Sequence, residues 1–172
     1  IEVMKAGKPV YVEKPMARSF SECQEMLNVS IETGMPMWVA YYRRALPAFL
    51  KAKELLQSGV IGKPLLVHIK LYKKAEERNQ TMEEMHWHVF PEVGGAGYFF
   101  DLASHQFDYL DFVFGKVTAV SGQASNQAGL YPAEDTVSGT WKHESGVVGT
   151  GSWCFVVDEK SETDEIQIIG EK

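Results

Sequence analysis

The hydrophobic pattern of the chain changes its period once, near Lys116, and this change restricts the possible folds more than any other feature. Before it, apolar residues recur at helical spacing in 20–33, 45–58 and 98–114, with short β-branched or aromatic runs between these segments. After it, apolar and polar residues alternate as they do in half-buried strands. The pattern therefore predicts an α/β arrangement followed by a sheet of consecutive strands.

The N-terminal residues predict a strand, a helix and a second strand. Val10–Val12 is a short strand-like run, and Pro15 ends it because proline lacks a backbone donor. Ser19 and Glu22 are spaced as a helix capping box, and the helix that they open is followed by a buried strand-like run over 37–42. Since strand, helix and strand in this order form a βαβ unit, we expect the two strands to be parallel.

The remaining strand-like segments predict a second, larger sheet. They cover residues 65–72, 117–125, 135–142, 147–156 and 165–169, and a tight turn over 143–146 joins two of them. We expect these strands to pair mainly antiparallel. The predicted fold is α/β: the tail of a doubly wound domain over residues 1–45, followed by a truncated α+β domain with a large open sheet over residues 46–172.

The segment 98–114 carries the clearest chemical pattern. Asp101 and His105 stand four residues apart on one stripe of this otherwise apolar helix, with Ser104 and Asp108 beside them. A mostly buried helix must turn such a stripe toward a partner or a cavity. A carboxylate beside an imidazole raises the pKa of the imidazole and prepares it to accept a proton from an alcohol. The alternative is an ordinary aspartate–histidine contact on a solvated helix face.

Three glycines precede this helix within residues 94–97. Glycine lets the backbone approach a ligand or a strand closely, and it leaves bare amides near the helix N-terminus. The glycine order of a dinucleotide-binding loop is absent, and no long strand leads into the run. A flexible turn before the helix is the alternative interpretation.

Lys14 follows the first predicted parallel strand, at the edge where open α/β sheets bind ligands. Its ammonium group can hydrogen-bond a substrate hydroxyl or stabilise an alkoxide as it forms. Arg43 and Arg44 end the next parallel strand and can reach the same crevice. The alternatives are a surface lysine in a tight turn, and arginines that are solvated or ion-paired.

His86, Trp87 and His88 follow one another beyond the predicted strand over 65–72. Two histidines separated by one residue diverge on a helix, and no third ligand is evident at usable spacing, although Glu83 and Glu84 are close in sequence. The sequence therefore does not favour a metal site. Trp87 is a candidate for the aromatic wall of a pocket, with plain packing as the alternative.

Composition argues against several classes of function. The net charge of −6 opposes nucleic-acid binding, and no apolar run approaches the roughly 20 residues of a membrane helix. Cys23 and Cys154 do not form a metal pattern and suit the reduced thiols of a cytoplasmic enzyme, with a single disulfide between them as the alternative. Neither Ser152 nor Cys154 has a base at a convincing distance in sequence, which speaks against a nucleophilic hydrolase.

Several short motifs occur in a fixed order along the chain. They are Ala6-Gly7-Lys8-Pro9-Val10, Glu13-Lys14-Pro15, Tyr42-Arg43-Arg44, Gly59-Val60-Ile61-Gly62, Gly95-Ala96-Gly97, the pair Asp101 and His105, then Asp108 and Glu134-Asp135. In this order the set resembles the glucose–fructose oxidoreductase and inositol dehydrogenase family (Gfo/Idh/MocA) over essentially the whole chain. The resemblance implies an N-terminal Rossmann domain that binds NAD or NADP. It also implies a dihydrodipicolinate-reductase-like C-terminal domain whose open sheet often forms the interface of a homo-oligomer.

The resemblance also assigns roles to single residues in hydride transfer between a nicotinamide and a sugar or polyol. Lys14 hydrogen-bonds the reacting hydroxyl, His105 is the general base or acid, and Asp101 orients it or binds the substrate. The implied cofactor contacts are Glu13, Lys14, Pro15 and Arg44. The implied substrate contacts are Trp87, Asp101 and His105.

The chain departs from the family pattern in two ways. Ala96 stands where members often have the middle one of three glycines, a change that we expect to be tolerated. No Gly-rich pyrophosphate loop, with its acidic residue for the adenosine ribose, precedes Glu13. We therefore expect the chain to be part of a larger enzyme and to be silent by itself. Two alternatives remain: a non-catalytic binding or oligomerisation domain, and a relative that cleaves glycosides by transient oxidation.

Overall fold

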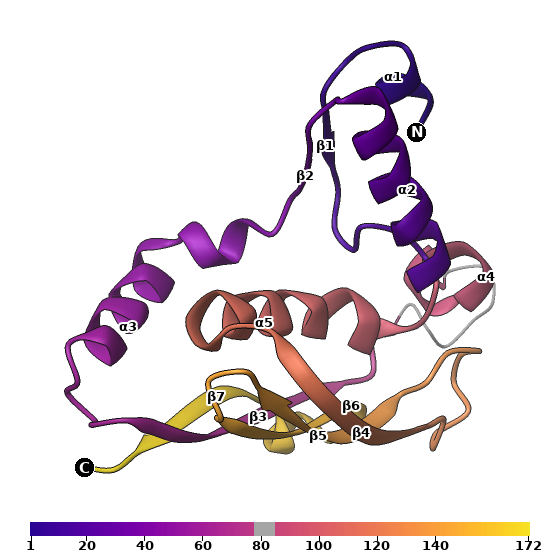
Figure 1. Cartoon of the computed structure of the whole chain (residues 1–172). Coiled ribbons are helices and arrows are strands. Elements are labelled where there is room, and N and C mark those ends of the chain that lie inside the picture. The colour runs from indigo at the N-terminus through magenta and orange to yellow at the C-terminus, as the bar shows by residue number, and fades with distance from the viewer. Residues whose placement is uncertain (78–84) are drawn as a thin grey trace.

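The computed structural model describes residues 1–77 and 85–172. The N-terminal part forms a small α/β unit that stands above a larger sheet (Figure 1). Its elements are α1 (Glu2–Lys5), β1 (Val10–Val12), α2 (Phe20–Thr33) and β2 (Met37–Val39). Strands β1 and β2 pair in parallel, so the predicted βαβ unit is confirmed.

The predicted capping box opens α2. The Ser19 side chain accepts a hydrogen bond from the Glu22 backbone N–H, which satisfies one of the free donors of the first turn. At the other end, Gly34 adopts the left-handed conformation that closes the helix. The residues before and after the helix therefore determine its length.

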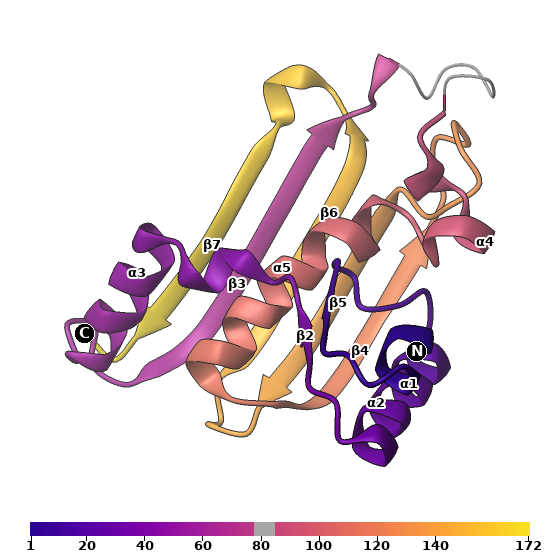
Figure 2. The same cartoon turned by 90° about the horizontal axis from the view of Figure 1, so that it is seen from above.

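A connecting stretch leads from the small unit to the sheet and to the central helix. Its elements are η1 (Tyr42–Ala45), α3 (Pro47–Gln57), β3 (Pro64–Lys74), η3 (Trp87–Val89), α4 (Pro91–Gly94) and α5 (Tyr98–Phe114). Seen from above, α5 lies over the middle of the sheet and α3 over the side that carries β7 (Figure 2). None of the helices in the described ranges 1–77 and 85–172 is long and apolar enough to span a membrane.

The large sheet has five strands in the order β4-β5-β6-β3-β7. The strands after α5 are β4 (Val117–Ser125), β5 (Thr136–His143), β6 (Val148–Val157) and β7 (Thr163–Gly170), with the short helix η4 (Glu159–Ser161) before β7. All neighbours are antiparallel except β3 and β6, which run parallel. The parallel pair is possible because the long connection through α5, β4 and β5 brings the chain back to β6 in the direction of β3.

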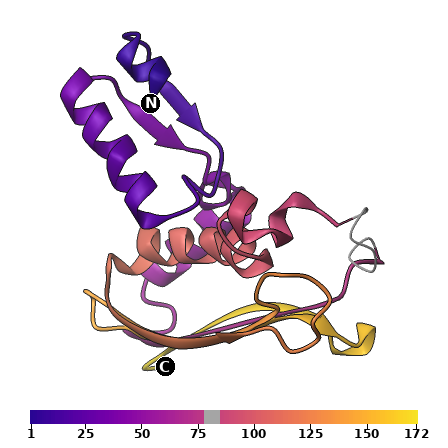
Figure 3. The same ribbon diagram turned by 90° about the vertical axis from the view of Figure 1, so that its right-hand side faces the viewer.

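The hydrophobic core lies between α5 and one face of this sheet. It contains Ala103, Leu110 and Phe114 of α5 together with Val67, Ile69 and Trp153 of the strands beneath. No described helix covers the opposite face of the sheet (Figure 3). Side chains on that face pair with one another, as His68 does with Thr150 at 2.5 Å and Tyr72 with Ser152 at 2.6 Å.

Two buried tryptophans occupy the space that glycines leave on β6. A Cβ atom on Gly149 would lie 2.0 Å from Trp141 Cε2, and one on Gly151 would lie 2.2 Å from Trp153 Cη2. The indole N–H of Trp141 donates to His143 Nε2 at 3.1 Å. Each ring therefore packs directly on glycine backbone, and these glycines have a steric role in the core.

Candidate active site

The small unit meets α5 through main-chain contacts at the glycine run. Gly95 has φ +89°, and a Cβ atom there would lie 2.5 Å from the carbonyl oxygen of Arg18. A Cβ on Gly97 would lie 2.8 Å from the carbonyl oxygen of Glu134. The glycines therefore admit neighbouring backbone, which supports close approach to protein rather than the flexible turn that was the alternative.

Glu134 holds the first turn of α5 in place. Its carboxylate oxygen Oε1 accepts a hydrogen bond from the Gly97 backbone N–H at 3.1 Å. A carboxylate at a helix N-terminus satisfies a free donor and interacts favourably with the helix dipole. This contact fixes the turn that carries Asp101.

Lys14 and Asp101 form an ion pair between the loop after β1 and the first turn of α5. The ammonium Nζ donates to carboxylate oxygen Oδ1 of Asp101, and it lies 3.5 Å from the backbone oxygen of the same residue. The side chains are 18% and 16% exposed, so the pair is largely shielded but still reaches solvent. The predicted Asp101–His105 contact is wrong: among residues 1–77 and 85–172, no hydrogen bond or ion pair joins them.

His105 lies under two tyrosines and is only 2% exposed. Its ring meets Tyr41 edge-on at a centroid distance of 5.8 Å and Tyr42 at 5.1 Å. Its Nδ1 atom makes no hydrogen bond within the part of the chain that the structure describes. The sequence placed both tyrosines in a buried strand, so their contact with His105 was missed.

The pKa of His105 is lowered to about 4, mainly by burial and then by the positive charges of Arg43 and Lys14. Asp101 and Asp108 act in the opposite direction but do not compensate. The prediction of a raised imidazole pKa is therefore wrong in sign. The reason is that Lys14, a residue distant in sequence, takes the carboxylate while the tyrosines exclude water from the ring.

Arg44 in η1 contacts the same helix one turn further on. Its Nε donates to Asp108 Oδ2 at 2.8 Å, and its Nη2 donates to Oδ1 of that residue and, at 3.2 Å, to the backbone oxygen. The hydrogen bonds to Asp108 raise the pKa of Arg44. The guanidinium also lies over the ring of Phe112. Its assignment to cofactor binding stays a prediction.

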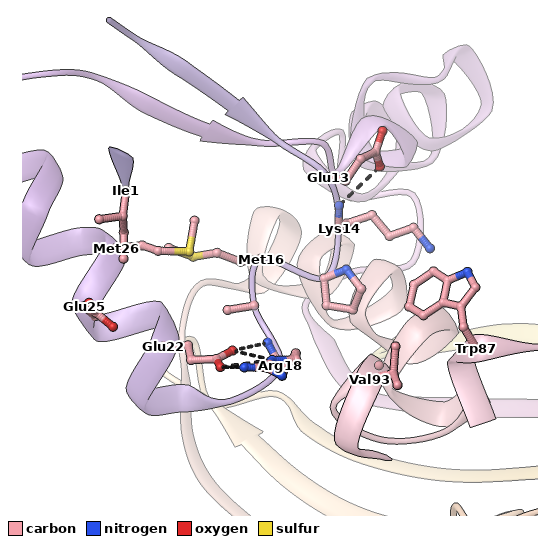
Figure 4. Close-up of a pocket in the computed structure, with 13 residues that line it drawn as sticks. Ile1, Glu13, Lys14, Met16, Arg18, Glu22, Glu25, Met26, Trp87 and Val93 are labelled. Atoms are coloured by element: carbon pink, nitrogen blue, oxygen red, sulfur yellow. Dashed lines mark hydrogen bonds and ion pairs between the residues drawn. The ribbon is translucent and has the colours of Figure 1, made fainter. Parts of the chain in front are cut away.

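A cavity of about 480 Å³ opens beside Lys14 (Figure 4). Glu13, Lys14 and Pro15 line it together with Trp87, and Figure 4 shows the Lys14 side chain extending toward Trp87. The Trp87 side chain is half exposed at this wall. His105 does not line the cavity. The structure thus brings Lys14, Glu13, Pro15 and Trp87 to one cavity and places His105 behind Asp101 and the tyrosines.

The other chemical candidates form no site of their own. Within residues 1–77 and 85–172, no group of three His, Cys, Asp or Glu side chains is placed to hold a metal ion, and Glu83 and Glu84 lie outside these ranges. The rings of His86 and His88 stack with centroids 4.1 Å apart. Ser152 pairs with the Tyr72 hydroxyl.

Comparison with known proteins matches this architecture to one family. A model described as the GFO/IDH/MocA C-terminal domain matches residues 49–172. Oxidoreductase P35 of Formosa agariphila is 33% identical over 172 residues, which is 100% of this chain and 52% of that protein. The NAD(+)-dependent scyllo-inositol 2-dehydrogenase of Bacillus subtilis is 32% identical over 123 residues, 71% of this chain and 33% of that protein.

A solved structure gives the same picture. The WlbA dehydrogenase from Bordetella pertussis, in complex with NADH and UDP-GlcNAcA, superposes with a TM-score of 0.85 at 27% identity over 99% of this chain and 49% of that one. The relatives that share this fold and sequence are named as oxidoreductases and dehydrogenases. This chain belongs to the GFO/IDH/MocA family. The whole chain aligns with Oxidoreductase P35 but spans only about half the length of that protein.

Proposed function

We propose that this chain is the substrate-side part of an NAD(P)-dependent oxidoreductase that transfers hydride between a nicotinamide and a hydroxyl-bearing carbon of a sugar or polyol. The observation that carries the proposal is the shielded Lys14–Asp101 ion pair beside a cavity, one helical turn from buried His105. A shielded ammonium group at a cavity wall is suited to stabilise an alkoxide as it forms.

Each residue has a distinct part in this proposal. Lys14 hydrogen-bonds the reacting hydroxyl, and Asp101 orients the lysine by accepting a hydrogen bond from its ammonium group. His105, uncharged at neutral pH, is the proposed general base or acid, and its Nδ1 is unpaired within the described residues. Because this side chain is buried and does not line the cavity, the ring must become accessible to the hydroxyl when substrate binds. Trp87 supplies an apolar wall on which a sugar ring can stack.

The residues of the cavity fit the nicotinamide end of NAD or NADP. Glu13 and Lys14 form a polar edge, and Pro15, Met16 and Trp87 form apolar walls for a flat ring. The glycines at 94–97 do not form a pyrophosphate loop, because they pack on protein backbone. The nicotinamide would supply or accept the hydride, and this chain would contribute the acid–base groups.

The function is tested by comparing this chain alone with a chimaera in which the dinucleotide-binding half of Oxidoreductase P35 precedes Ile1. We expect reduced nicotinamide to form only with the chimaera, when free sugars or polyols are offered with NAD or NADP. Turnover by the chain alone would contradict its proposed dependence on that half. A folded, NAD-binding chimaera that leaves every free sugar and polyol unchanged would overturn the function, and cleavage of glycosides would favour the glycoside-cleaving alternative.

Homo-oligomer formation through the open face of the sheet is also part of the proposal. Thr140 lies on that face, because its neighbour Trp141 is buried against the opposite one. We expect light scattering to show an oligomer for the parent chain and a monomer for Thr140→Arg, since an arginine would be buried without a partner. Gln57→Arg on α3 is the matched control, and a monomeric parent chain would contradict the proposal.

A cytoplasmic location completes the proposal. It is supported by Cys23 and Cys154, both of which are free thiols in the structure. Cell fractionation tests this location, and recovery of the protein from the cell exterior would exclude it.

A further inference from the structure

The segment that joins the small unit to α3 contacts His105 through two aromatic rings, although sequence patterns gave it no role in acid–base chemistry. Tyr41 and Tyr42 both present ring edges to the imidazole, with interplanar angles of 82° and 73°. Two residues later, Arg44 grips Asp108 through both carboxylate oxygens and the backbone oxygen. One short segment therefore contacts α5 at His105 and again at the following turn.

We propose that Tyr41, Tyr42 and Arg44 are positioning residues for His105: the tyrosines fix the ring and exclude water from it, and Arg44 locks the helical turn that follows. The inference rests on the proposed function, since it gives His105 a defined orientation for proton transfer. Tyr41, Tyr42 and Arg44 thereby orient His105 without themselves donating or accepting the transferred proton.

The geometry explains why two contacts are needed. Edge-on aromatic contacts constrain the position of a ring but leave the helix beneath it free to rotate. A bidentate arginine–carboxylate pair is strongly directional, so the Arg44–Asp108 pair resists that rotation. The guanidinium of Arg44 also makes a cation–π contact with Phe112 of the same helix.

The surrounding charges do not by themselves account for an uncharged His105. Arg43 in η1 and Lys14 after β1 disfavour the imidazolium, whereas Asp101 and Asp108 on α5 favour it. Burial is the largest cause of the lowered pKa, and Tyr41 and Tyr42 are the aromatic rings in contact with the imidazole. Removing a tyrosine should therefore admit water and move the pKa of His105 upward, toward the ordinary value of about 6.5.

The test is an NMR titration of the histidine rings in this chain, with His105 assigned by its loss in His105→Gln. We expect His105 in the parent chain to titrate near pH 4. In Tyr42→Ala the midpoint should rise by about one unit or more, while Tyr42→Phe, which keeps the ring, should match the parent. Tyr41→Leu provides a second variant should Tyr42→Ala fail to fold, and its midpoint should also rise.

A separate measurement addresses Arg44. In Arg44→Met the His105 signals should broaden or double, because the turn at Asp108 is released, and Arg44→Lys should restore part of the sharpness. Phe20→Ala, which removes a ring that is 80% exposed, is the matched control and should change neither observable. The titration needs neither cofactor nor substrate, so its outcome is independent of whether the proposed function holds.

Three outcomes would overturn the proposal. They are a parent His105 that titrates near pH 6.5, a midpoint that stays in place in both the folded Tyr42→Ala and the Tyr41→Leu chains, and a Tyr42→Phe midpoint that moves as far as that of Tyr42→Ala.

Discussion

Replacing Lys14 with methionine is expected to lower turnover of the completed chimaera by roughly 10²–10³-fold, the usual loss when one donor to a developing oxyanion is removed. The physical reason is that methionine cannot donate to the substrate oxygen from the wall of the cavity that Lys14 lines. Turnover per folded molecule is the quantity to measure, with the folded fraction determined by circular dichroism.

A second substitution separates chemistry from stability. Methionine also leaves the Asp101 carboxylate without its partner, so some stability should be lost. Lys14→Arg keeps a positive charge beside Asp101 and should retain stability, but its planar guanidinium cannot take the position of the ammonium toward substrate. Full turnover in the arginine variant, or lost stability with unchanged turnover in the methionine variant, would show that Lys14 is only structural. Lys51→Met on the exposed face of α3 is the control.

Replacing Gly149 with alanine is expected to destabilise the chain by about 2–4 kcal/mol, which is a large part of the stability of a typical domain. The added methyl group would lie 2.0 Å from Trp141, a ring that is 3% exposed and packs against Phe107 and Trp153. Moving the ring also breaks its hydrogen bond to buried His143. Urea unfolding of the parent and variant chains measures the difference.

A matched control lies on the neighbouring strand. A Cβ atom on Gly139 would come no nearer than 3.3 Å to Ser121, so Gly139→Ala should cost less than about 1 kcal/mol.

Combining Gly149→Ala with Trp141→Leu should give a loss smaller than the sum of the two single losses, because the smaller side chain leaves room for the methyl group. Additive losses in this double variant would mean that the ring and the glycine do not compete for space.

Local patterns were sufficient to predict most of the fold. The capping residues of α2, the apolar spacing of α5 and the alternation of β4 each depend on near neighbours, so their positions in the sequence carry the signal. One local prediction was wrong, because the strand predicted over 37–42 ends at Val39 and Tyr42–Ala45 forms the 3-10 helix η1. Distant contacts were also missed. The parallel pairing of β3 with β6 depends on the whole intervening chain, and no local pattern records it.

The contacts among the candidate site residues were not predicted from the sequence. Lys14, Asp101 and His105 were all selected from the sequence, yet Asp101 pairs with a residue 87 positions away instead of its helical neighbour. The pKa of His105 was predicted in the wrong direction for the same reason. Helical spacing indicates which side chains can meet, whereas burial and competing partners are properties of the folded chain.

The glycine contacts bear on how such a site can be changed. The backbone of Gly95 lies against Arg18 and that of Gly97 against Glu134, so closely that a Cβ atom at either glycine would clash. The Gly95 contact therefore sets the distance between the loop that follows Lys14 and the start of α5, and a side chain at this position would change that distance. The side chains of Met16, Trp87 and Val93, by contrast, line the cavity and can be replaced without changing these backbone contacts. A change of substrate preference is therefore best sought by substituting these three cavity residues while Gly95 and Gly97 are kept.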